Sequence, residues 1–77
     1  MKRVYPEQEI LILWFLRTER EIVRYRLAKM LGVPQGIARG VLARMKRKGL
    51  ITVRHRAGTR ASSKGLRELV AQMKQEH

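Results

Sequence analysis

The sequence predicts a small, mainly helical α+β domain in which four helices accompany a short β-hairpin. Two observations lead to this fold class. Apolar residues recur with helical spacing on both sides of Gly32, and the step Gly32-Val33-Pro34 marks the end of one helix and the start of the next. Residues 50–61 then show the alternation of a hairpin. The 77 residues are expected to form a single domain, 1–77, with one small core.

Residues 6–18 are predicted to form the first helix. Pro6 can occupy its first turn, and Glu7 and Glu9 suit the positive end of the helix dipole. The middle of this segment, ILILWFL, is apolar on every side, which is more than packing against one neighbour requires. Either a small core surrounds this helix, or part of it forms a homodimer interface. The residues assigned to that interface are Leu11, Trp14 and Phe15.

Two further helices are expected at residues 24–31 and 34–48, after a short β-branched step at Ile22-Val23. The turn between them is about three residues long, so the two helices must cross steeply, as in a helix-turn-helix unit. Each helix has one apolar side that is expected to face the core. These residues are Tyr25, Leu27, Ala28 and Leu31 in the first, and Ile37, Ala38, Val41, Leu42 and Met45 in the second.

The C-terminal part contains the hairpin and a last helix. Residues 50–54 have strand composition, residues 55–59 form a basic turn, and Arg60-Ala61 can pair back as a second strand. Ser62 or Ser63 is a suitable N-cap for a helix at 63–75. The residues that this helix is expected to bury are Leu66, Leu69, Val70 and Met73. The predicted order is therefore helix, short strand, helix, helix, strand, strand, helix.

Charge gives the strongest indication of function. The chain has 18 Lys and Arg against 6 Asp and Glu, a net charge of +12. Residues 22–67 contain 13 Lys or Arg and no acidic residue, whereas a surface that serves only solubility normally mixes both signs. A polyanionic partner is expected, nucleic acid before an anionic membrane. The apolar content of 44% is too high for a disordered basic tail.

Other classes of function lack their sequence signatures. The chain has no cysteine and two histidines, which make no credible metal site, and neither an acid pair nor a phosphate-binding loop suggests an enzyme or a cofactor. Neither a secretory signal nor a membrane-spanning run is recognisable, so a cytoplasmic, nucleoid-associated protein is expected. The absence of Asp, Asn and Cys favours a thermophilic source.

The run YRLAKMLGVPQGIARGVLARMKRKGLI resembles the winged helix-turn-helix pattern, in which a helix and turn precede a recognition helix that ends before Gly-Leu-Ile. The run SSKGLRELV is similar to the start of the last helix in such regulators, with Ser62 in the cap position and Ala61 where a larger apolar residue is usual. The resemblance is to small archaeal winged-helix DNA-binding proteins of the transcription-regulator type. It implies that residues 34–48 enter the major groove and that the wing, 50–61, contacts the backbone or the minor groove.

The outward side of the 34–48 helix combines small and basic residues. Gln35, Arg39 and Ala43 are the candidates for base contacts, while Gly36 and Gly40 allow close approach to DNA or, alternatively, to a helix of another protein. The candidates for phosphate contacts are Arg44, Lys46, Arg47 and Lys48 in this helix and Arg24, Arg26 and Lys29 in the preceding helix. In the wing, the candidates for contact with the backbone or insertion into the minor groove are Arg54, His55, Arg56 and Arg60.

The sequence therefore predicts a protein that binds double-stranded DNA, as a homodimeric transcription regulator. Two alternatives stay open: an architectural DNA binder without sequence preference, and an accessory module that binds RNA or a protein complex. The few aromatic residues argue against single-strand binding by base stacking, and no small-molecule pocket is evident.

Overall fold

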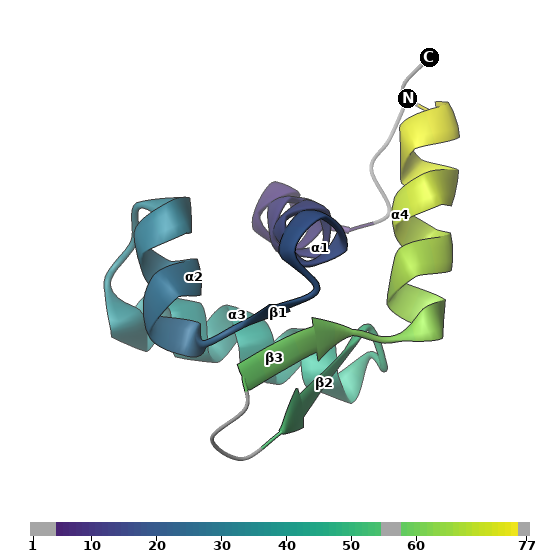
Figure 1. Ribbon diagram of the computed structural model, residues 1–77. Coiled ribbons are helices and arrows are strands. Elements are labelled where there is room, and N and C mark those ends of the chain that lie inside the picture. Colours follow the sequence, from purple (N-terminus) through teal and green to yellow (C-terminus); the bar gives the residue numbers. More distant parts are fainter. Residues whose placement is uncertain (1–4, 55–57, 76–77) are drawn as a thin grey trace.

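The computed structural model describes residues 5–54 and 58–75. It contains four helices and three strands in the order that the sequence predicts. The elements are α1 (Glu7–Glu19), β1 (Glu21–Ile22), α2 (Arg24–Leu31), α3 (Gln35–Arg47), β2 (Ile51–Arg54), β3 (Gly58–Ala61) and α4 (Ser63–Gln75). The α+β fold class and its winged-helix arrangement are confirmed (Figure 1).

α1 runs through the middle of the molecule, between α2 and α4, with α3 and the sheet beneath it (Figure 1). This position explains why its apolar residues face more than one neighbour: α1 packs against all three other helices and against β3. The buried core cluster draws on every helix and on the sheet. It consists of Ile12, Leu13, Leu16, Ile22, Leu27, Val41, Leu42, Met45, Leu50, Ile51 and Leu69.

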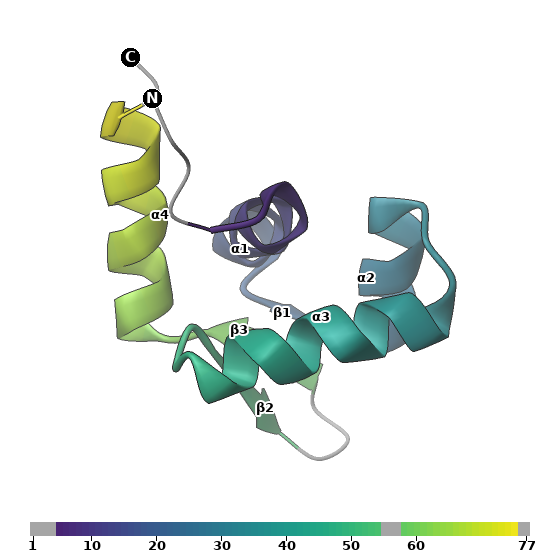
Figure 2. The same ribbon diagram turned by 180° about the vertical axis from the view of Figure 1, so that it is seen from behind.

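The helix-turn-helix forms as predicted. Gly32 ends α2 with a left-handed φ of 73°, and the N–H of Val33 donates to the carbonyl of Ala28 at 3.1 Å. Pro34 then provides the extended N-cap from which α3 begins. Figure 2 shows α2 standing steeply across the first part of α3, with α3 lying along one side of the molecule.

The three strands form one antiparallel sheet in the order β1-β3-β2. β3 is central: Thr59 pairs with Ile22 on one side and with Val53 on the other. Because side chains alternate along a strand, Thr59 and Val53 share one face of the sheet, and Arg60 lies on the opposite face with its cross-strand neighbours Glu21 and Thr52. The same alternation places Arg54 on the face that carries Thr52 and Arg60, so both described wing cations lie on the face opposite Val53 and Thr59.

The buried face of α4 is rotated from the expected one, although Leu69 and Met73 pack in or against the core as predicted. Leu66 and Val70, predicted to be buried, are 38% and 40% exposed, while Gly65, Leu69 and Gln72 are buried. The reason is a close backbone contact, because a Cβ atom at Gly65 would overlap the carbonyl oxygen of Leu50. The buried face is thereby centred on Gly65 and Leu69 rather than on Leu66.

Ser62 caps α4, as one of the two predicted alternatives. Its Oγ accepts the N–H of Gly65 at 2.9 Å and donates to the carbonyl of Gly49 at 2.6 Å. The cap therefore ties the start of α4 to the turn that follows α3.

Two apolar residues of the helix-turn-helix do not face the core as predicted. Tyr25 is 52% exposed and Ile37 is 51% exposed. The buried side of α2 is narrower than expected and consists of Leu27 and Ala28. On α3 the buried residues are Ala38, Val41, Leu42 and Met45, so Ile37 lies at the edge of this stripe.

None of the helices in the described ranges is both long enough and apolar enough to cross a membrane.

Candidate nucleic-acid interface

The outer face of α3 carries most of the predicted contact residues. Its buried stripe holds the helix against the core, so the opposite side faces solvent. Gln35, Gly36, Arg39, Ala43, Arg44, Lys46 and Arg47 are exposed, and Gly40 is half-buried. A Cβ atom at Gly36 would meet no heavy atom within 4 Å, and one at Gly40 would reach only Nη1 of Arg44 at 4.0 Å. Packing within the described part of the chain requires neither glycine. At both positions the backbone of the helix is not covered by a side chain of its own.

A hollow of about 290 Å³ lies where α2, α3 and the wing meet. Three cations from two helices line it: Arg24 at the start of α2, and Arg39 and Lys46 on α3. Its apolar lining comes from both α3 and the sheet. The remaining lining residues are Leu42, Ala43, Val53 and Thr59. We call this feature the α3–wing groove.

The cations of the α3–wing groove are not neutralised internally. Among residues 5–54 and 58–75, no carboxylate forms an ion pair with Arg24, Arg39 or Lys46, and none of the three makes a side-chain hydrogen bond. Like charges held around one hollow repel one another, and an anion between them removes that repulsion. The groove can therefore accept phosphate oxygens or the acceptor atoms of base edges.

Two other cations of α3 are engaged by a buried acid. Glu9 of α1 is fully buried and accepts hydrogen bonds from Nζ of Lys48 at 2.9 and 3.0 Å. Arg44 places Nε 3.8 Å from the same carboxylate. The sequence assigned Lys48 and Arg44 to phosphate; in the structure both face Glu9, and their first partner is internal.

Sequence reasoning missed the buried role of Glu9, because an acid in a first helical turn is already explained by the helix dipole. A signal was nevertheless present. Glu9 stands three, four and seven residues before Ile12, Leu13 and Leu16, which are the buried residues of α1. The same spacing that identifies the core face places this carboxylate on it.

Tyr5 completes this end of the molecule. Its hydroxyl donates to Oε1 of Glu68 on α4 at 3.0 Å, and Nζ of Lys48 lies 5.4 Å from the centre of its ring. Burial, and then the hydrogen bond and the negative charge of Glu68, raise the pKa of Tyr5 above its ordinary value. The cluster joins the first helical turn, α3 and α4.

Of the predicted phosphate-contacting residues on α2, some are engaged within the protein and one is available. Arg24 joins the α3–wing groove. Arg26 pairs with Glu19 at 3.0 Å, and Nζ of Lys29 lies 4.7 Å from the ring centre of Tyr25. Arg26 and Lys29 are thus partly engaged on the protein surface, whereas Arg24 is available.

The structure also places the predicted contact residues of the wing in different surroundings. Arg54 is exposed at the end of β2. Arg60 is on the sheet face opposite Val53 and Thr59, and it lines a different hollow beside α1. It therefore does not join Arg39 and Lys46 in the α3–wing groove. His55 and Arg56 lie outside the described residues.

The residues assigned to a dimer interface have unequal exposure. Leu11 and Trp14 are 38% and 45% exposed, whereas Phe15 is half-buried and packs against the core. The adjacent helix α4 also exposes two apolar side chains, Leu66 and Val70. Within the described ranges, no group of three or more His, Asp or Glu side chains is placed to hold a metal ion.

Comparison with known proteins identifies no relative: no protein family matches the sequence, and no curated protein matches it.

Proposed function

We propose that this protein binds double-stranded DNA, with α3 in the major groove and the wing against the backbone or the minor groove, and that it acts in the cytoplasm, at the nucleoid, as a transcription regulator. The observation that carries the proposal is the α3–wing groove. It gathers three unpaired cations beside a helix face that bears only small or basic residues and Gln35. An α-helix fits the width of the major groove, and small side chains let its backbone come close.

The positions of the three cations in the α3–wing groove suggest that they contact different parts of DNA. Arg39 lies near the middle of the outer face, beside Gly36, Gly40 and Ala43, where a guanidinium can reach the O6 and N7 atoms of guanine. Lys46 lies two turns further along, and Arg24 projects from α2, so both suit phosphate oxygens. Ala43 and Val53 add apolar surface of the kind that contacts a thymine methyl group.

Single-charge variants test this assignment. Random-site selection first provides a preferred duplex, and fluorescence anisotropy then measures Kd for that duplex and for a scrambled one. Arg39→Gln is expected to weaken the preferred duplex by roughly tenfold more than the scrambled one, which corresponds to about 1–3 kcal/mol of base discrimination. Lys46→Gln is expected to weaken both duplexes equally. Arg67→Gln, on the exposed face of α4, is the matched control and should change neither Kd.

The same experiment separates the alternatives. Absence of any enriched sequence would favour an architectural binder, which uses the same cations for phosphate alone. Tighter binding of duplex RNA than of duplex DNA would contradict the proposal and favour an RNA-binding module.

We also propose that the active form is a homodimer that pairs through α1. Leu11 and Trp14 supply exposed apolar surface there, and a two-fold dimer would present two α3 helices to major grooves about 34 Å apart. Sedimentation velocity tests this. The wild type should sediment as a dimer and Trp14→Gln as a monomer, with Val23→Ser as an exposed apolar control. A monomeric wild type would contradict the dimer.

A further inference from the structure

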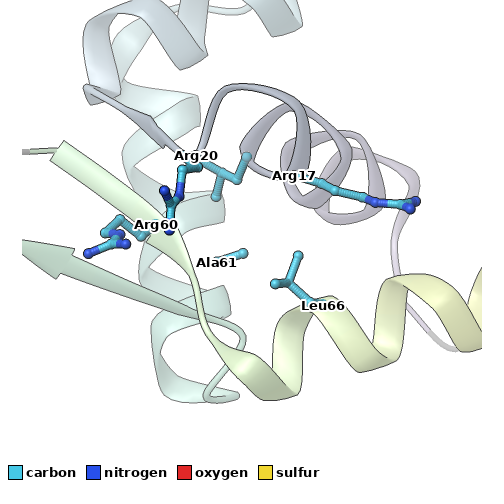
Figure 3. Close-up of a pocket in the computed structure, with 6 residues that line it drawn as sticks. Arg17, Arg20, Arg60, Ala61 and Leu66 are labelled. Atoms are coloured by element: carbon cyan, nitrogen blue, oxygen red, sulfur yellow. The ribbon is translucent and has the colours of Figure 1, made fainter.

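A second hollow, of about 300 Å³, lies between the end of α1, the strand β3 and the start of α4. Figure 3 shows Ala61 at its centre, with Leu66 on one side and the side chains of Arg20 and Arg60 on the other. Its volume is at the lower end of the range for small-molecule sites. None of its lining residues belongs to the α3–wing groove, although both hollows use β3.

The inner lining of this hollow is apolar. Leu16 is 2% exposed, Ala61 is half-buried, and Leu66 is 38% exposed and faces the same space. The single methyl group of Ala61 leaves room that a larger side chain at this position would occupy. The hollow thus offers a surface on which a small apolar group can lie.

The rim of the hollow is cationic. The guanidinium groups of Arg20 and Arg60 form no hydrogen bond or ion pair with any residue of 5–54 or 58–75. Glu21 is the cross-strand neighbour of Arg60, yet it makes no ion pair with Arg60 in this part of the chain. Arg20 also has a positive φ of 68°, the only non-glycine residue among those described to do so. Two like charges thus lie beside an apolar surface, and no described residue provides a counter-ion.

Arg17 contributes differently. Its Nη1 donates to Sδ of Met73 at 3.7 Å, and its guanidinium lies 5.8 Å from the ring centre of Trp14. Figure 3 shows this guanidinium pointing away from Arg20 and Arg60. Arg17 thus lines the hollow with its aliphatic stem, while Arg20 and Arg60 supply the available charge.

We propose that this hollow binds a small organic anion with an apolar body, the class represented by aromatic carboxylates. The carboxylate would accept hydrogen bonds from Arg20 and Arg60, and the apolar body would lie on Leu16, Ala61 and Leu66. The proposal does not depend on DNA binding, because the α3–wing groove supplies none of these residues.

Heteronuclear NMR of the 77-residue chain tests the proposal with 1-naphthoate as the probe. Saturable shifts are expected for the amides of Arg20, Ala61 and Leu66. Two controls separate the parts of the ligand: 1-naphthalenemethanol keeps the apolar body without the charge, and acetate keeps the charge without the body. Each should bind at least tenfold more weakly than 1-naphthoate, because each lacks one half of the recognition. Equal affinity for acetate would overturn the proposal.

Variants locate the site. The double change Arg20→Gln and Arg60→Gln should weaken 1-naphthoate by about tenfold or more, because it removes the charged donors while leaving the apolar lining. Ala61→Leu should abolish saturable binding by filling the hollow. Arg67→Gln removes a charge from α4 outside the hollow and should leave Kd unchanged. An equal loss in Arg67→Gln, or shifts centred on α3 instead, would overturn the proposal.

Discussion

Glu9 shows how a single residue can change role once the chain is folded. Its position in the first turn of α1 suits the helix dipole, but its carboxylate is fully buried and is held by Lys48 at 2.9 and 3.0 Å. It thereby fixes the C-terminal end of α3 against α1. Two cations that the sequence assigned to DNA thus support the orientation of α3 from behind.

Glu9→Gln is expected to lower the free energy of unfolding by about 1–3 kcal/mol, because it removes the charge that pairs with Lys48 and Arg44. Urea unfolding followed by circular dichroism measures this change. Glu19→Gln is the matched control, because its pair with Arg26 is exposed and should contribute less than about 1 kcal/mol. Equal effects of the two variants would contradict the role given to Glu9.

Tyr5 provides a prediction that depends on pH. Its pKa is raised in the folded state, so the stabilisation from its neutral hydroxyl is fully present below the ordinary value of 10.0 and is lost as the pH rises through the raised pKa. Below pH 10, Tyr5→Phe should be less stable than the wild type by about 0.5–1.5 kcal/mol, the contribution of the bond to Glu68. This difference should shrink at more alkaline pH. A difference that stays constant in urea unfolding across this range would refute the assignment.

At the scale of elements, glycines in two helices have opposite roles. Gly65 lies where α4 meets the backbone of Leu50, and no other residue fits that contact. Gly40 lies in the middle of α3, where an added Cβ atom would reach only Nη1 of Arg44 at 4.0 Å. A glycine inside a helix is less favourable than alanine by about 1 kcal/mol, so Gly40 is retained at a loss of stability that packing within the described chain does not explain.

Gly40→Ala is therefore expected to raise the free energy of unfolding by up to about 1 kcal/mol and, at the same time, to weaken DNA binding by narrowing the approach. Gly65→Ala should lower the free energy of unfolding by roughly 1–3 kcal/mol, because the added methyl overlaps Leu50. Thermal unfolding and duplex anisotropy measure the two properties separately. Stabilisation by Gly40→Ala with unchanged DNA affinity would show that the glycine does not serve DNA approach.

The elements themselves were largely predictable from local signals. Gly32 and Pro34 define the turn between α2 and α3, and Ser62 defines the start of α4, because each acts on its neighbours in the chain. The faces of the elements were less predictable. Leu66 is exposed and Gln72 is buried because α4 turns its Gly65 side toward Leu50, a contact between residues distant in sequence that periodicity does not reveal.

The candidate site was also predictable only in part: the sequence indicates which residues of one helix face outward, but not which other elements lie beside them. The sequence identified Arg39 and Lys46 as outward-facing residues of α3, because the apolar stripe fixes the opposite side of that helix. It did not predict that Arg24 lies beside them or that Arg60 faces away, because both depend on the crossing of α2 and on the register of β3.

At the scale of the whole molecule, charge is segregated. Between residues 22 and 67 the chain has no acidic residue, and two acids of α1, Glu9 and Glu19, are used in contacts with Lys48 and Arg26. The α3–wing groove therefore keeps its positive potential. A protein that binds a polyanion through such a surface releases counterions, so its affinity falls with salt.

A salt titration measures how strongly DNA binding depends on these cations. In anisotropy measurements with duplex DNA, the slope of log K against log salt should be steep for the wild type. The slope should become shallower by about 0.9 for each phosphate-contacting cation removed, as in Lys46→Gln or Arg24→Gln. Arg67→Gln should keep the wild-type slope. A slope that changes equally in all three variants would indicate diffuse attraction rather than binding in the groove.

NMR mapping with a duplex shows whether DNA contacts the α3–wing groove. Titration of isotopically labelled protein with a short duplex should shift and broaden the amides of Arg24, Arg39, Lys46 and Val53. It should leave those of Leu11, Trp14 and Val70 unchanged apart from any uniform broadening. Changes centred on α1 and α4 with an unperturbed α3, or no saturable change at low salt, would contradict DNA binding through the α3–wing groove.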